Sequence, residues 1–255
     1  MSLDITYARD LVAQASSIVV LTGAGVSAES GVPTFRGPGS LWKSHRPEEL
    51  ATPEAFARDP RLVWEWYAWR RSLVADCAPN PAHECLARLA LDHESTRLVT
   101  QNVDGLHHRA ADSVAADHED PSRAYPLEVH GAIHRDRCSG CDRRTPGRND
   151  IEASSTDSLP HCENCQSLLR PDVVWFGEAL DSTIINDSFE AARSADLCLV
   201  IGTSAVVYPA ASVPEITLDS GGTVIEVNPQ ETHLSPRSSV SLKGRAGEVL
   251  PDILD

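Results

Sequence analysis

The chain has 255 residues, with 37 acidic and 22 basic side chains and a formal net charge of −15. Hydrophobic residues make up 41%, which is typical of a packed globular protein and excludes a disordered one. A charge this negative argues against direct binding to nucleic acid or to an anionic membrane surface. The length allows one large domain or two unequal ones.

The basic residues are unevenly divided, since only Lys43 and Lys243 are lysines and the rest are arginines. An acidic surface poor in lysine is typical of proteins that stay hydrated in high salt, as in halophilic archaea. An acidic protein from a GC-rich bacterium is the alternative. No run of about 18 apolar residues predicts a transmembrane helix, and residues 1–4 have no basic or apolar leader. We therefore expect a cytoplasmic protein, active as a monomer.

The first half of the chain predicts helices around an early strand. Residues 3–15 have helical spacing, and the β-branched run at 17–22 is typical of a strand buried on both faces. Residues 53–76 and 82–90 are predicted helices, and 97–100 is a short strand. A Gly-rich turn follows the first strand at once.

The second half continues the alternation after an acidic stretch, residues 111–125, which predicts a surface loop. A helix is predicted at 184–195. The strand candidates are 126–129, 172–175, 197–201 and 223–227. Strands that alternate with helices predict an α/β fold with a doubly wound parallel sheet.

Residues 132–170 differ from the rest, because they are polar and Arg-rich and have little apolar periodicity. They contain two Cys-x-x-Cys pairs, Cys138 with Cys141 and Cys162 with Cys165. Four thiolates in two such pairs are typical of a structural, tetrahedral zinc site. Bound metal would supply the folding free energy that this segment lacks. We expect a small zinc-binding module inserted in the α/β domain, with a closed and therefore non-catalytic site.

The other cysteines and one histidine near the pairs have simpler interpretations. Cys77, Cys85 and Cys198 lie in apolar or helical surroundings and are predicted to be buried. His161 adjoins Cys162, but four cysteines already fill the site, so we expect it on the surface. A redox dithiol does not explain two pairs.

The turn after the first strand reads Gly23-Ala24-Gly25, with Ala28 at the third position of a dinucleotide-binding fingerprint. Small residues let backbone N–H groups approach a pyrophosphate closely. The acidic residues about twenty positions further on, Glu48 and Glu49, lie in no predicted strand, so the fit to an ordinary dehydrogenase is poor.

Longer motifs point to one family. They are GAGVSAESGVPTFRG at 23–37, TQNVDGLH at 100–107, EVHG at 128–131, LRPDVVWFGE at 169–178, IGTS at 201–204, NP at 228–229 and KGRA at 243–246. With the two cysteine pairs in the same order, the chain closely resembles the sirtuins, the NAD-dependent protein-lysine deacylases, over nearly its whole length.

The resemblance implies a Rossmann-type domain at 1–131 and 171–255, with the zinc module at 132–170. It implies that NAD is consumed as a co-substrate and that acyl-lysine proteins or peptides enter the cleft between the two parts. The NAD-binding residues that it implies are Gly23, Ala24, Gly25, Ser27, Glu29, Thr34, Phe35, Arg36, Trp42, Gln101, Asn102, Val103, Asp104, Gly202, Thr203, Ser204, Asn228, Pro229, Gln230 and Ala246.

In the reaction that the resemblance implies, the acyl oxygen attacks C1′ of the nicotinamide ribose, and a base then activates a ribose hydroxyl. Histidine has a pKa near the working pH, and the motif match selects His130, assisted by Asn102 and Asp104. His107 and His108 are rivals, interpreted instead as a helix-start and a surface residue. Asp104 has a second interpretation as a helix N-cap.

The substrate residues fall in three places. Val174, Phe176, Gly177 and Glu178, with 206–208 opposite, match the segments that pair with a peptide by strand addition. Tyr67 and Arg70 are three apart on a predicted helix, where a phenol and a guanidinium share one face and suit a carboxylate.

The Tyr-x-x-Arg pattern resembles that of class III sirtuins, which prefer succinyl-, malonyl- or glutaryl-lysine. Ala51 matches the small residue of their acyl pocket, and Thr34 agrees with that class. Arg71 is interpreted as a surface residue, and the three nearby tryptophans as core. A helix with an arginine-lined solvent face is the alternative.

Two other functions stay open. A mono-ADP-ribosyltransferase would also cleave NAD but would transfer ADP-ribose to a protein. A catalytically silent zinc-bearing module that binds nucleic acid is the other; the charge of −15 and the intact set of Asn102, Asp104 and His130 argue against it.

Overall fold

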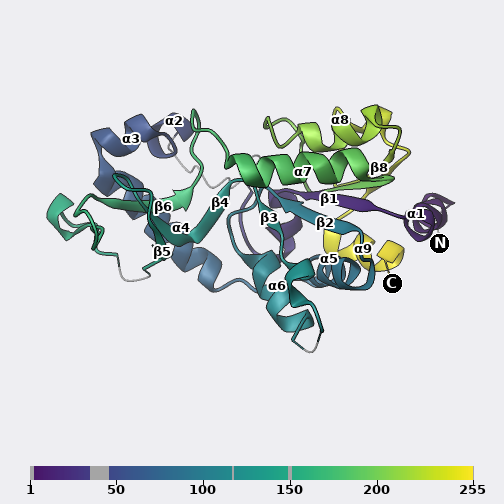
Figure 1. Ribbon diagram of the computed structural model, residues 1–255, viewed down its shortest axis with the longest axis horizontal. Coiled ribbons are helices and arrows are strands. Elements are labelled where there is room, and N and C mark those ends of the chain that lie inside the picture. The colour runs from purple at the N-terminus through teal and green to yellow at the C-terminus, as the bar shows by residue number, and fades with distance from the viewer. Residues whose placement is uncertain (1–2, 35–45, 117, 149–150, 255) are drawn as a thin grey trace.

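The computed structural model describes residues 3–34, 46–116, 118–148 and 151–254, which form a larger and a smaller lobe (Figure 1). The larger lobe contains a six-stranded parallel sheet in the order β3-β2-β1-β7-β8-β9. Its strands are β1 (Ile18–Thr22), β2 (Thr96–Thr100), β3 (Leu127–Glu128), β7 (Leu197–Ile201), β8 (Thr223–Asn228) and β9 (Val240–Lys243). The predicted doubly wound sheet is confirmed.

Helices cover both faces of this sheet (Figure 1). They are α1 (Leu3–Gln14), α5 (Pro81–Asp92), α6 (Leu106–Val114) and α9 (Ala246–Leu254) on one side, and α7 (Ser182–Ser194) and α8 (Ser212–Asp219) on the other. Alternate residues of β1 serve the two faces: Ile18 and Val20 pack in the core with α5 and α9, and Val19 and Leu21 in the core with α7 and α8. A continuous apolar strand therefore needs a helical layer on each side.

The smaller lobe contains an antiparallel sheet of three strands in the order β5-β4-β6. Its elements are β4 (Gly131–Cys138), β5 (Arg144–Pro146), β6 (Leu169–Val173), α2 (Pro47–Leu50), α3 (Pro53–Arg58) and α4 (Pro60–Ala75). Trp64 and Tyr67 of α4 pack with Ile133 and Leu169 in one core. The segment 132–170 lies in this lobe, but its core is completed by the helices at 47–75.

Short 3-10 turns complete the fold: η1 (Ala24–Ser30), η2 (Pro121–Ala124), η3 (Thr156–Ser158) and η4 (Ser235–Arg237). Among the described residues, no helix is both long enough and apolar enough to cross a membrane.

Three predicted elements need correction. The helix predicted at 53–76 is two helices, because Asp59 caps a new start by accepting from Leu62 N (3.0 Å) and Pro60 has no N–H to continue α3. The loop predicted at 111–125 begins too early, since α6 runs to Val114. The strand predicted at 172–175 ends at Val173 and pairs with β4 in the smaller sheet, not in the parallel one.

Candidate functional site

The neighbours β1 and β7 mark the point where the parallel sheet reverses its strand order, and ligands of such sheets bind beyond the carboxyl ends of the strands there. Gly23 follows β1 and Gly202 follows β7. The N–H of Gly25 donates to Gly202 O at 2.7 Å. A Cβ on Gly23 would lie 2.6 Å from Thr203 Cβ, and one on Gly25 would lie 2.7 Å from Gly202 Cα. Only glycine fits at positions 23 and 25, which leaves a backbone cradle suited to a diphosphate.

Side chains from the next strands close on this turn. Gln101 donates through Nε2 to Thr203 Oγ1 (2.9 Å), and Asn228 donates through Nδ2 to Thr203 O (2.7 Å). Asn102 is buried and donates through Nδ2 to Gly23 O (3.1 Å). These hydrogen bonds thus bring the carboxyl ends of β1, β2, β7 and β8 together around the glycine turn.

Asp104 lies beside Asn102 in a buried polar cluster. Ser27 donates to its Oδ2 at 2.8 Å, and Leu106 N donates to its Oδ1 at 2.9 Å at the start of α6. Burial raises the pKa of the Asp104 carboxyl, although these two hydrogen bonds lower it. His83, whose Nε2 lies 3.3 Å from Ser27 Oγ behind the carboxylate, was not among the residues predicted from the sequence.

The remaining predicted NAD residues surround this cluster. Glu29 accepts from Gly247 N (2.7 Å), which places it next to the buried Ala246. Ala24 and Thr34 are half-buried, Val103 is buried, and Ser204, Pro229 and Gln230 are exposed. Phe35, Arg36 and Trp42 lie outside the described residues.

His130 lies between the two lobes, with Nδ1 3.0 Å from Gln101 O. Because a carbonyl oxygen only accepts, Nδ1 carries the proton and Nε2 keeps its lone pair. Burial lowers the pKa of the His130 imidazole, although the Gln101 hydrogen bond opposes this. The ring is therefore neutral at pH 7, as a proton acceptor must be.

The segment 174–178 follows β6 and is hydrogen-bonded both to His130 and to the smaller lobe. Val174 N donates to His130 O (2.9 Å), and Phe176 N donates to Ala51 O (3.0 Å). Phe176 is 52% exposed, and across the lobes Val206 and Tyr208 are 47% and 57% exposed. Exposed apolar side chains of this kind suit a peptide laid between the two segments.

The carboxylate of Glu178 accepts hydrogen bonds from residues of its own turn and of β6. It accepts from Arg170 at 2.5 and 2.9 Å and from Trp175 N at 2.8 Å. Burial alone would raise the pKa of the Glu178 carboxyl, but these hydrogen bonds hold it below its usual value. The side chain orders the turn, so only the backbone of Glu178 is available to a peptide.

Tyr67 and Arg70 lie on the face of α4 that packs toward the site, and both are buried. Trp175 Nε1 donates to the Tyr67 hydroxyl at 2.9 Å. The Arg70 guanidinium carbon lies 4.7 Å from the centre of the Trp66 ring. Arg70 lines a cavity with eight other residues: Ala24, Val32, Pro33, Val74, Asn102, Val103, Asp104 and Ile133. Arg70 thus reaches the site, and Tyr67 packs beside it, with its ring centre 5.3 Å from the Arg70 guanidinium carbon.

The surface assignment of Arg71 is wrong, because its side chain is only 3% exposed. It forms an ion pair with Asp136 at 2.6 Å and donates through Nε to Ile133 O at 2.6 Å. The residue next to Arg70 therefore fastens α4 to β4. Helical spacing alone did not reveal this, since its partners lie more than sixty residues away.

The four predicted metal ligands converge, with all four sulfur atoms within 4.8 Å of one another. The Cys138 and Cys165 sulfurs are 3.4 Å apart, and those of Cys141 and Cys162 are 3.7 Å apart. Tetrahedral zinc with bonds of about 2.3 Å needs sulfurs about 3.8 Å apart. The donor set fits one zinc ion. Cys77, Cys85 and Cys198 are buried and His161 is exposed, as predicted.

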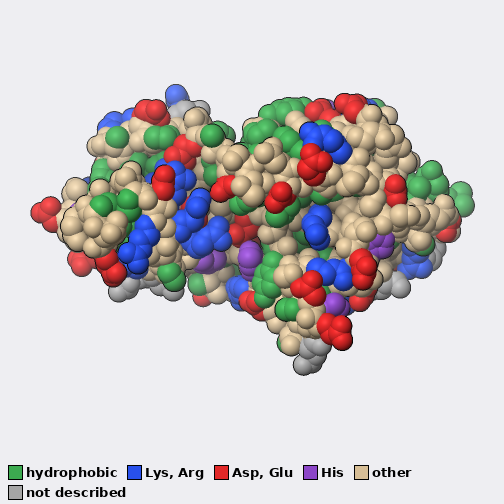
Figure 2. All heavy atoms as spheres, in the orientation of Figure 1, with side chains coloured by type: hydrophobic (Ala, Val, Ile, Leu, Met, Phe, Trp, Pro, Cys, Tyr) green, Lys and Arg blue, Asp and Glu red, His purple; other side chains and the backbone are tan. Residues whose placement is uncertain are grey.

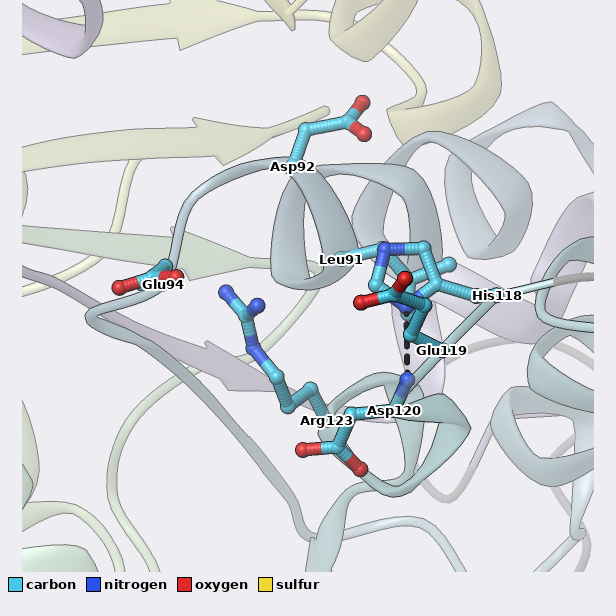
Figure 3. Close-up of a pocket in the computed structure, with 7 residues that line it drawn as sticks. All are labelled: Leu91, Asp92, Glu94, His118, Glu119, Asp120 and Arg123. Carbon is cyan, nitrogen blue, oxygen red and sulfur yellow. Dashed lines mark hydrogen bonds between the residues drawn. The ribbon is translucent and has the colours of Figure 1, made fainter.

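A second depression lies on the larger lobe, where Arg123 points between carboxylates of neighbouring segments (Figure 3). Its lining residues are Leu91, Asp92, Glu94, His118, Glu119, Asp120 and Arg123. Asp92 and Glu94 precede β2, so the depression lies at the amino ends of the strands. It is separate from the predicted NAD site, which lies at the carboxyl ends.

Comparison with known proteins identifies close relatives along the chain. The model of the Sir2 family matches residues 23–209. The NAD-dependent protein deacylase of Thermococcus kodakarensis is 48% identical over 251 residues, covering 97% of this chain and 93% of the relative. That of Pyrococcus furiosus is 46% identical over 247 residues, covering 96% and 94%.

Solved structures have the same fold. A Sir2 homologue in complex with NAD superposes with a TM-score of 0.86 at 44% identity, covering 98% of this chain and 92% of that one. A Sir2 complex with a p53 peptide and NAD⁺ gives a TM-score of 0.83 at 29% identity, covering 99% and 97%.

Proposed function

Because the chain belongs to the Sir2 family, we propose that it is an NAD-dependent protein-lysine deacylase. The reaction yields nicotinamide, free lysine and O-acyl-ADP-ribose. The observation that carries this function is the meeting of the glycine cradle, Asn102 and Asp104 with a neutral His130 at the edge of a peptide segment.

The residues divide the work by position. Gly23, Gly25 and Gly202 hold the diphosphate through the backbone, and Asn102 and Asp104 line the nicotinamide and its ribose. NAD⁺, when bound, would supply C1′ of its nicotinamide ribose as the carbon from which nicotinamide departs. His130 accepts a proton at Nε2 from a ribose hydroxyl, because its Nδ1 proton is committed to Gln101 O.

The acyl pocket is formed by Ala51, Tyr67 and Arg70, and we propose that it prefers acyl groups that end in a carboxylate, such as succinyl and malonyl. Support comes from the burial of Arg70, because a desolvated guanidinium favours a carboxylate over a neutral methyl group. The peptide lies along Val174, Phe176, Gly177 and Glu178, and the acidic surface favours lysine-bearing targets.

We further propose that the enzyme works as a monomer in the cytoplasm. None of the seven cysteines, all of them among the described residues, forms a disulfide, which suits a reducing compartment. Outside the two peptide segments, the exposed large apolar residues of the described chain are Leu3 and Tyr7, too few for a large permanent interface.

Acetyl-, malonyl- and succinyl-lysine peptides with NAD⁺, analysed by mass spectrometry, test this function. We expect Arg70→Met to lower kcat/KM for the succinyl peptide by about 30-fold, the equivalent of a lost charge-assisted bond of about 2 kcal/mol, and to change deacetylation less than threefold. His130→Tyr should abolish all three activities. Equal loss on acetyl and succinyl peptides would refute the acyl assignment, and ADP-ribosylated protein without free lysine would identify a transferase instead.

A further inference from the structure

The strand β4 leaves its pairing with β6 just after it enters the smaller lobe. Ala132 pairs with Asp172, but the next pair is Asp136 with Pro171, so four residues along the antiparallel β4 correspond to a single step back along β6. The backbone of residues 133–135 therefore has no pairing partner on β6. This β4 bulge, residues 133–135, lies against the larger lobe, where its polar groups find other partners.

The β4 bulge donates hydrogen bonds to two consecutive carbonyl oxygens of the loop that contains Asn102 and Asp104. Ile133 N donates to Val103 O at 2.8 Å, and His134 Nε2 lies 2.8 Å from Asp104 O. A carbonyl oxygen only accepts, so His134 Nε2 carries the proton and donates it. The loop is thus fixed from the smaller lobe through its backbone, while its side chains point toward Gly23 and Ser27.

The ring of His134 also covers the next residue of the loop, Gly105. A Cβ on Gly105, which has φ of 75°, would lie 2.9 Å from His134 Cδ2. The imidazole therefore both donates to the loop and packs on the turn that leads into α6. A side chain that lacks the donor but keeps the bulk would separate these two contributions.

The β4 bulge is itself firmly supported on both sides of His134. Arg71 donates to Ile133 O at 2.6 Å and to Arg135 O at 3.1 Å. Arg135 pairs with Glu128 of β3 at 2.7 Å and with Asp172 of β6 at 3.0 Å. A rigid support means that the hydrogen bond from His134 restrains the loop and is not absorbed by movement of the bulge.

We propose that His134 is a positioning residue for the NAD site. Its hydrogen bond to Asp104 O holds the loop 102–104 against the smaller lobe and so sets the directions of the Asn102 and Asp104 side chains. His134 acts through this loop and touches neither substrate nor reacting atoms. The inference rests on the proposed function only in that the loop binds NAD⁺.

The test compares three variants with the wild-type protein. His134→Leu removes the donor, and His134→Gln keeps an N–H at nearly the position of Nε2. His161→Leu is the matched control, because His161 is also an exposed histidine of the smaller lobe with a ring nitrogen 2.8 Å from a carbonyl, that of Leu159.

Two readouts are independent of turnover. Hydrogen exchange of the peptide covering 101–106 should be faster in His134→Leu, and calorimetry should show NAD⁺ binding weakened about fivefold, the loss expected for one neutral hydrogen bond. His134→Gln should recover wild-type values within twofold, and His161→Leu should match the wild type in both.

Unchanged exchange in His134→Leu overturns the proposal, as does faster exchange without weaker NAD⁺ binding. Failure of His134→Gln to recover either value also overturns it, because the donor would then be irrelevant. A wild-type protein that binds NAD⁺ but leaves every acyl peptide intact contradicts the proposed function alone, since both readouts here need no deacylation.

Discussion

The two lobes are stabilised by different interactions. In the larger lobe, β1 and β7 are buried along their whole length between two helical layers. In the smaller lobe, arginines and aspartates of the strands and of α4 pair with one another, and four cysteines gather at one end. In Figure 2 the basic side chains of the smaller lobe gather toward the boundary between the lobes.

This difference explains where the site lies. Buried apolar strands give a rigid edge on which Gly23, Asn102 and Gly202 are held by close backbone contacts and hydrogen bonds. Polar cross-links let the smaller lobe dock on that edge through specific bonds, such as those of Arg135 with Glu128 and His134 with Asp104. Each lobe should therefore fail under a different perturbation.

Removal of metal should have the largest effect, and it should fall on the smaller lobe. We expect Cys138→Ser to unfold this lobe, because the free energy of zinc binding, about 10–16 kcal/mol in zinc-finger peptides, is comparable to the whole stability of a typical domain, about 5–15 kcal/mol. The four tryptophans among the described residues, Trp64, Trp66, Trp69 and Trp175, all lie in the smaller lobe, so their fluorescence reports its unfolding.

Circular dichroism supplies the contrasting measurement, because most helices belong to the larger lobe and should survive. Cys198→Ser is the matched control, since Cys198 is buried in β7 and binds no metal. A single transition that removes both signals together in Cys138→Ser would show that the lobes fold as one unit and would refute the comparison.

Loss of the Arg71 ion pair should come second. Arg71→Met leaves Asp136 buried and uncompensated, which should lower the free energy of unfolding by about 3–5 kcal/mol. Arg88→Met is the control in the larger lobe, because the Arg88–Glu84 pair is exposed and spans 3.5 Å, so its loss should cost less than about 1 kcal/mol. Urea unfolding measures both losses, followed by tryptophan fluorescence for Arg71→Met and by circular dichroism for Arg88→Met. Equal losses would contradict the contrast.

The sequence predicted the larger lobe better than the smaller one, for a physical reason. Continuous apolar runs such as 17–22 and 197–201 directly indicate buried strands. The small residues after each strand indicate where two backbone segments must approach each other closely. The zinc ligands were equally readable, because the chemistry of four thiolates depends on spacing that is local in the sequence.

The smaller lobe depends on pairings that no local pattern shows. Arg71 looked like any polar residue of a helix face, and its burial follows only from Asp136 and from carbonyls far along the chain. The break at Asp59 has a local sequence signal, a capping residue before Pro60, which the prediction of one helix over 53–76 did not use. His83 and His134 had no signal, because their partners are side chains and carbonyls brought together by the fold.

Acid should act on the larger lobe, and the share of its effect that His83 carries should be the smallest of the three. Burial lowers the pKa of His83 from 6.5 to about 4. Between pH 6.5 and pH 4 the His83 side chain is protonated in the unfolded chain but not in the folded one. The contribution of His83 to the free energy of unfolding is therefore fully present above pH 6.5, decreases as the pH falls, and stops changing below pH 4. The loss from His83 amounts to about 3 kcal/mol.

His107 touches His83, with ring centres 4.7 Å apart, and its pKa is also lowered by burial, so both rings contribute in the same direction. His83→Gln removes one of these contributions and keeps a polar group near Ser27. Urea midpoints at pH 7.5 and pH 4.5 should therefore differ less in His83→Gln than in the wild type. If the two proteins lose equal stability over this interval, the acid sensitivity lies elsewhere, and the buried histidines do not distinguish the larger lobe from the smaller.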